Sequence, residues 1–115
     1  MTLSRTITKL NFDNYQSAAK LTAVYPEKVG LAYLSLGLGN EAGEVQGKVK
    51  KYLRGDYDAS QMREKLEGEL GDVLWYLAVL ADHIGLSLDQ IAQANIAKLH
   101  DRAVRGKLKG DGDTR

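Results

Sequence analysis

Two pairs of carboxylates with the same spacing stand out in the sequence. Glu41 and Glu44 form the first pair, and Glu69 and Asp72 form the second, each with two residues between its acids. Residues three positions apart lie on one face of a helix, so both carboxylates of a pair can hold one ion. Because these four side chains provide only oxygen ligands, the expected ion is a hard cation such as Mg²⁺, with Mn²⁺ as a substitute.

Basic side chains accompany these acids. Lys48 and Lys51 continue along the flank of the first pair, and Asn95, Lys98 and Arg102 share one face of a later predicted helix. A lysine beside a bound metal suits a polyphosphate, and a cationic stripe with an amide suits phosphate together with a base or sugar. The alternative for both groups is a solvated basic surface, and for the acids a pair of charged helix edges.

The elements that must position these residues are helical, because helical periodicity dominates and no alternating strand pattern appears. We expect four helices, over about 12–24, 29–54, 60–84 and 87–104. The two long central helices would form an antiparallel hairpin, with the outer two packed against it. The prediction is an all-α, four-helix architecture in one domain over residues 1–105, followed by a flexible, glycine-rich C-terminal tail over residues 106–115.

The lengths of the two hairpin arms predict that the acidic pairs meet. At about 1.5 Å per residue, the arms between the turn and the acids are roughly 15 and 14 Å long. Folding back therefore places Glu44 opposite Glu69, and Glu41 opposite Asp72. Four like charges at one level are unstable unless protons or cations neutralise them, which strengthens the prediction of a metal site.

The composition limits the class of protein. The chain has 115 residues, of which 43% are hydrophobic and 27% charged, as expected for one globular domain. A net charge of +1 gives no general field for nucleic acid, and no apolar run is long enough to cross a membrane. The absence of cysteine excludes disulfides and thiol nucleophiles, and it fits a cytoplasmic location.

The second central helix also predicts assembly. Between residues 73 and 81 it is apolar on every side. If Val73 and Leu77 face the domain, the opposite side of the helix points outward. That side carries Trp75 and Val79, and a helix that is apolar all round must be buried on more than one side. We therefore expect a homo-oligomer with Trp75 at or near the subunit interface.

The acidic motifs and their neighbours resemble a known family. Residues 38–44 (LGNEAGE) followed by residues 69–77 (ELGDVLWYL) look like the MazG-type all-α nucleoside triphosphate pyrophosphohydrolases, and residues 95–102 are similar to the downstream element of that family. The chain resembles the short, single-domain MazG-like proteins of phages and bacteria. One departure is Asn40, where such sequences often carry a further acid.

The resemblance implies hydrolysis of ribo- or deoxyribonucleoside triphosphates to the monophosphate and pyrophosphate with Mg²⁺, as housekeeping of the nucleotide pool. It implies that the catalytic metal ligands are Glu41, Glu44, Glu69 and Asp72. It further implies that the substrate-binding residues are Lys48, Lys51, Asn95, Lys98 and Arg102. It also favours a dimer or a tetramer. The alternatives are a relative on the same fold specific for dUTP or phosphoribosyl-ATP, and a non-catalytic helical oligomer that binds metal or a partner protein.

Overall fold

The structure is a computed structural model that describes residues 9–115. Its regular elements are α1 (Phe12–Lys20), the short 3₁₀ helix η1 (Glu27–Val29), α2 (Gly30–Leu53), α3 (Ala59–His83) and α4 (Leu88–Val104). No strand occurs within residues 9–115, so the prediction of an all-α chain with four α-helices is confirmed. Of the helices described, none is both long and apolar enough to cross a membrane.

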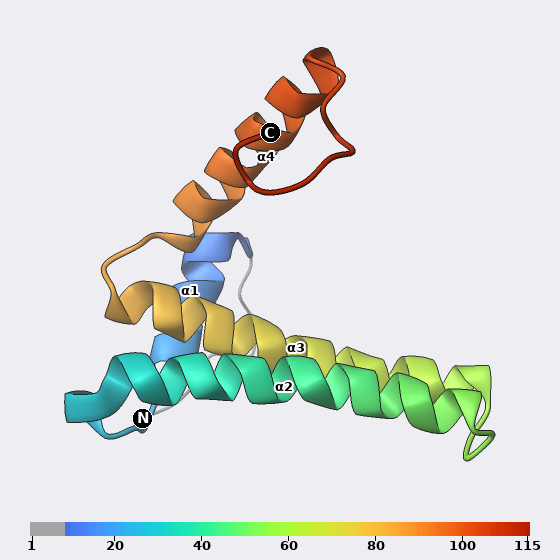
Figure 1. The fold of residues 1–115 in the computed structure, drawn as a ribbon. Coiled ribbons are helices and arrows are strands. Elements are labelled where there is room, and N and C mark those ends of the chain that lie inside the picture. The colour runs from blue at the N-terminus through green and yellow to red at the C-terminus, as the bar shows by residue number, and fades with distance from the viewer. Residues whose placement is uncertain (1–8) are drawn as a thin grey trace.

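The two longest helices, α2 and α3, lie side by side, and the chain reverses direction between them (Figure 1). Gly55 follows the end of α2 with a φ of 91°, a conformation that favours glycine. Asp58 then caps α3, because its carboxylate accepts from the backbone N–H of Gln61 while the Gln61 side chain accepts from that of Asp58. This capping box starts the helix at Ala59, one residue before the predicted Ser60.

The first helix is shorter than predicted. Asn11 caps it, but it ends at Lys20 rather than at residue 24. The reason is a local contact, since the Thr22 hydroxyl donates to the backbone carbonyl of Ala19 at 2.7 Å and so competes with the helical hydrogen bonds. The residues after Lys20 form turns that lead to η1.

The outward direction predicted for Trp75 and Val79 is wrong. Val79 is 1% exposed, and Trp75 is partly buried against the core. The indole N–H of Trp75 also donates to the Thr22 hydroxyl at 2.8 Å. In contrast, Leu77, which was expected to face the domain, is 36% exposed. The cause is α1, which packs with the segment after it against the side of α3 that the sequence assigned to the surface.

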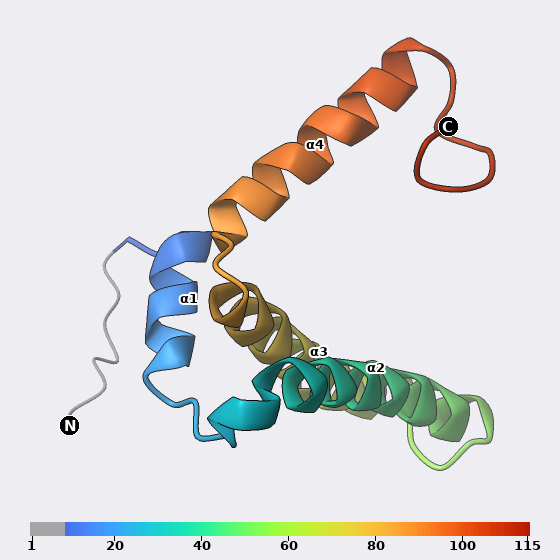
Figure 2. The same cartoon turned by 60° about the vertical axis from the view of Figure 1, so that its left-hand side comes forward.

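The core lies at one end of the α2–α3 pair. There α1 and the start of α4 meet α3 (Figures 1 and 2). The buried apolar residues that form this core are Ala19, Leu34, Ala78, Val79 and Leu88. Neither α2 nor α3 has a fully buried residue in the half that lies nearer the turn between them. That half of the pair is only two helices thick.

The last helix leaves the rest of the chain. It contacts α1 and α3 near its start and then projects away from the α2–α3 pair (Figure 2). No Cα atom of α4 lies within 8 Å of α2. The expectation that both outer helices pack against the central pair is therefore met in part, because α1 packs against α3 and most of α4 stands apart.

One buried glutamine fixes where α4 begins. Gln16 is 7% exposed, and its amide nitrogen donates to the backbone carbonyls of Ala78 at 3.1 Å and Leu86 at 2.9 Å. Its amide oxygen accepts from the backbone N–H of Leu88 at 3.1 Å. A single α1 side chain thus joins α3, the α3–α4 connection and the first residue of α4.

A carboxylate of α1 adds to this attachment. Asp13 Oδ1 accepts from the Ser87 hydroxyl at 2.7 Å and from the backbone N–H of Asp89 at 3.1 Å, and these bonds lower the pKa of Asp13. Ser87 itself caps α4, because its hydroxyl accepts from the backbone N–H of Gln90. A negative charge at a helix N-terminus is favourable, so Asp13 also stabilises the first turn of α4.

We predict that Gln16→Ala lowers the free energy of unfolding by about 1–3 kcal/mol or more, because it leaves buried backbone groups unpaired. The measurement is urea unfolding followed by circular dichroism. The control is Gln93→Ala, which removes an exposed glutamine of α4 and should change the free energy by less than about 0.5 kcal/mol. Equal effects of the two substitutions would show that the Gln16 attachment does not hold in solution.

Candidate functional site

Three of the four predicted acids come together across the α2–α3 pair. Glu41, Glu69 and Asp72 each place a carboxylate oxygen within 4.8 Å of the others. Glu41 and Glu69 are partly buried, and Asp72 is exposed. Burial raises the pKa of Glu41, and the charges of Asp72 and Glu69 raise it further. These groups therefore repel one another in the absence of a positive charge between them.

The fourth acid lies at the edge of this group. Glu44 is exposed and falls outside the set of mutually close carboxylates. It follows Glu41 by three residues on α2, and its charge contributes to the raised pKa of Glu41. Its role as a metal ligand stays a prediction.

Of the two lysines predicted on α2, one lies with the acids. Lys48 Nζ is 3.8 Å from Glu69 Oε1, and both side chains are largely covered. A hollow of about 400 Å³ opens beside this pair, and the residues that line it are Lys48, Gln61, Glu64, Lys65, Gly68 and Glu69. Its size is in the range of small-ligand sites. Lys51 is exposed and lies nearer the turn. There the pKa of Asp56 is lowered mainly by a hydrogen bond from Arg54, and the charge of Lys51 makes a smaller contribution.

The predicted residues of α4 lie elsewhere in the chain. Asn95 lines an apolar hollow of about 330 Å³ between α1, α3 and α4. Lys98 and Arg102 form ion pairs with Asp113 in the C-terminal segment. Lys98 and Arg102 lie in the part of α4 that projects away from the α2–α3 pair (Figure 2), so a single chain does not bring these two cations to the carboxylates. The predicted site is thus divided into an acidic group and an α4 group.

Sequence reasoning missed a tyrosine beside the acids. The ring of Tyr76 lies against Gly37, where a Cβ atom would be 2.1 Å from the ring. Burial raises the pKa of Tyr76, with further contributions from Tyr33 and Glu41, so its hydroxyl lies within electrostatic reach of the site. A signal was present, because Tyr76 follows Asp72 by four residues and so lies on the same face of α3.

Comparison with known proteins identifies the domain. Residues 31–105 match the MazG nucleotide pyrophosphohydrolase domain. The chain belongs to this family. The Gene 37 protein of Mycobacterium phage L5 is 44% identical over 115 residues, which cover 92% of this chain and 100% of that protein. The uncharacterized protein YvdC of Bacillus subtilis (strain 168) is 33% identical over 72 residues, which cover 56% of this chain and 68% of that protein. No solved structure matches the chain.

The residues of this MazG domain fit a divalent metal ion. The clustered side chains offer carboxylate oxygens and no nitrogen or sulfur ligand, a donor set that suits Mg²⁺ or Mn²⁺. Burial and then repulsion from Asp72 and Glu69 raise the pKa of Glu41, and a bound cation would relieve that repulsion. Glu41, Glu69 and Asp72 are the residues placed to hold such an ion.

We predict that Gly37→Ala destabilises this MazG domain by about 1–3 kcal/mol, because the new methyl group would displace the ring of Tyr76. The matched control is Gly39→Ala in the same helix, where no atom lies within 4 Å of the added Cβ. This second change should stabilise α2 by up to about 1 kcal/mol. Chemical unfolding measures both. If the two substitutions stabilised the chain equally, Tyr76 would not rest on Gly37 in solution.

Proposed function

We propose that the chain hydrolyses nucleoside triphosphates to the nucleoside monophosphate and pyrophosphate, with Mg²⁺ held by Glu41, Glu44, Glu69 and Asp72. The observation that carries this proposal is the convergence of three of these carboxylates within 4.8 Å in a MazG-family domain. A metal ion held there would neutralise phosphate oxygens and lower the pKa of the attacking water.

The products define the bond that breaks. Water attacks the α-phosphorus, the bond from that phosphorus to the bridging oxygen breaks, and pyrophosphate leaves. Lys48 is placed to assist, because its ammonium group lies 3.8 Å from Glu69 and can turn to an incoming phosphate oxygen. A carboxylate of the site takes the proton of the water.

We also propose that the chain acts as a homo-oligomer, either a dimer or a tetramer. Its accessible surface is 8540 Å², against about 6,200 Å² expected for a compact protein of this mass. Eight fully extended residues expose only about 1,300 Å², so residues 1–8 do not account for the excess. The radius of gyration is 17.0 Å, against about 13 Å expected. A second copy would cover the excess surface.

The exposed face of α4 is part of that surface. Ile96, Leu99 and Val104 are 66%, 39% and 73% exposed. Burial of such side chains contributes about 1.5–3 kcal/mol each, which favours association. Because α4 projects away from its own acids, we propose that it supplies Lys98 and Arg102 to the carboxylates of a neighbouring chain.

The proposed reaction predicts a strict dependence on divalent ions. With Mg²⁺ or Mn²⁺ the chain should release pyrophosphate and a monophosphate from a panel of triphosphates that includes dUTP and phosphoribosyl-ATP, and a chelator should stop the reaction. Glu69→Gln should lower kcat by at least about a hundredfold. The control, Glu67→Gln, removes an exposed acid of the same helix and should retain activity. Release of orthophosphate and a diphosphate would contradict the assignment.

The shared site predicts rescue between two inactive variants. Light scattering should give a mass well above the 12.6 kDa of one chain. Glu69→Gln removes an acid, and Arg102→Gln removes a residue of α4. A one-to-one mixture that exchanges subunits should recover roughly a quarter of wild-type activity in a dimer, because each mixed dimer contains one complete site. Full activity at a mass of 12.6 kDa would refute both assembly and sharing.

A further inference from the structure

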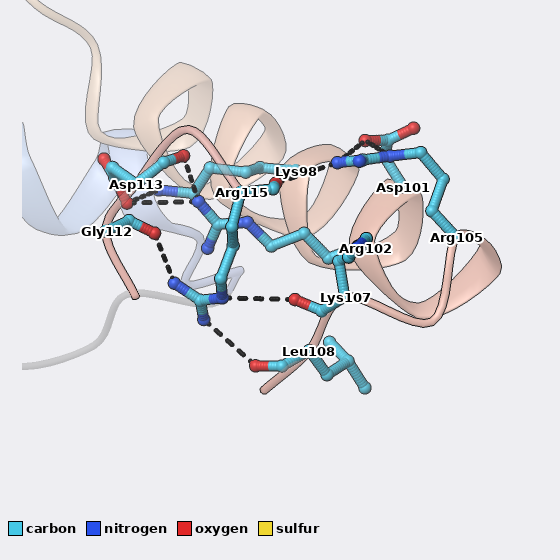
Figure 3. Close-up of polar contacts among 9 residues, drawn as sticks. All are labelled: Lys98, Asp101, Arg102, Arg105, Lys107, Leu108, Gly112, Asp113 and Arg115. Atoms are coloured by element: carbon cyan, nitrogen blue, oxygen red, sulfur yellow. Dashed lines mark hydrogen bonds and ion pairs between the residues drawn. The ribbon is translucent and has the colours of Figure 1, made fainter. Parts of the chain in front are cut away.

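The C-terminal segment of the chain, residues 106–115, folds back beside α4 (Figure 3). Lys98 Nζ lies 3.0 Å from Asp113 Oδ1, and Arg102 Nη2 lies 3.3 Å from the same oxygen. The Arg102 guanidinium also donates to the backbone carbonyl of Asp113. One aspartate near the chain end therefore contacts both cations that the sequence assigned to phosphate binding.

The segment is held in this folded-back path by its own last residue. The guanidinium of Arg115 donates to the backbone carbonyls of Lys107, Leu108 and Gly112 (Figure 3). Arg105 in turn donates to the carbonyl of Arg115 at 2.9 Å. Gly112 has a φ of 79°, which turns the chain so that Asp113 faces α4. The loop is thus closed by hydrogen bonds that its own residues make. Its flexibility stays a prediction.

The loop leaves Arg102 with little access to solvent. Arg102 is 4% exposed, although a buried arginine is rare unless it is paired. Its partner Asp113, in contrast, has a side chain that is 81% exposed. A ligand can therefore approach Asp113 from solvent, but it reaches Arg102 only after the loop has moved.

The chemistry of the pair suits an anion larger than a carboxylate. Lys98 and Arg102 are four residues apart, one helical turn, so their cationic groups converge on one point. Arginine and lysine bind phosphate oxygens as readily as they bind carboxylate oxygens. Hydrogen bonds from Lys98 and then Arg102 lower the pKa of Asp113, as expected for an anion held by two donors.

We propose that residues 106–115 form a latch over an oxyanion site made by Lys98 and Arg102, in which the Asp113 carboxylate occupies the place of a substrate phosphate group. This inference rests on the proposed function, in which α4 contributes these two residues to triphosphate binding. The latch competes with the ligand within the same chain. Only molecules with the latch open bind phosphate. The apparent affinity is therefore the affinity of the open form multiplied by the fraction of molecules that are open.

The test is the binding of inorganic pyrophosphate to the full-length chain, measured by isothermal titration calorimetry with a chelator present, so that neither metal nor turnover contributes. Asp113→Asn should tighten binding about three- to tenfold, because it removes the negative charge that pairs with both cations and so weakens the closed latch. The matched control is Asp111→Asn. It makes the same change of charge in the same loop, and Asp111 takes part in no ion pair among the described residues. It should change the affinity by less than about twofold.

A second variant separates the latch from a general effect of charge. Arg115→Gln removes a positive charge, which by itself would weaken the binding of any anion. The latch predicts the opposite, since the substitution opens the loop and should tighten pyrophosphate binding. Unchanged or weaker binding by Asp113→Asn, or equal tightening by Asp111→Asn, overturns the latch. Hydrolysis is assayed separately, so a chain that cleaves triphosphates without this tightening refutes the latch alone.

Discussion

The pairing of α2 with α3 is the constraint on which the rest of the structure depends. The arms from the turn to the acids are nearly equal in length, so side-by-side packing brings carboxylates of both helices to one level. The nine residues of α1 cover only one end of the pair. The core therefore lies at that end, and the clustered acids lie further along α2 and α3. The convergence of the acids and the incomplete cover of the α2–α3 pair therefore have the same origin.

Much of this arrangement follows from local rules that a sequence contains. The level of Glu41, Glu69 and Asp72 was predictable because helical rise and period are fixed. The helix ends at Gly55 and Gly85 were predictable because glycine readily adopts the positive φ that ends a helix. Both residues adopt it in the structure. The face of α3 that is buried could not be predicted, because the choice of face depends on the side of α3 against which α1 packs. The direction of α4 could not be predicted either, because its start is attached by hydrogen bonds of two α1 side chains, Gln16 and Asp13.

The candidate site was predicted in its parts rather than as a whole. The motifs identified an acidic group and a cationic group on different helices, and each is present in the structure. Spacing along a helix says nothing of the angle between helices, so it could not reveal that α4 carries its cations away from the acids. The proposed assembly and the C-terminal loop both concern this separation of the α4 cations from the acids. The proposed assembly would bring the cations to the acids of a neighbouring chain, and the proposed latch would determine when the cations are available.

The contact between Tyr76 and Gly37 links two positions that are distant in sequence. The ring occupies the space that any side chain at position 37 would need, so no larger residue can replace Gly37 while Tyr76 remains. In the evolution of such chains, the glycine would be retained for as long as a large ring stands opposite it. A side chain could enter at position 37 only together with a smaller residue at position 76. The pair should therefore vary in a correlated manner, although neither residue is one of the clustered acids.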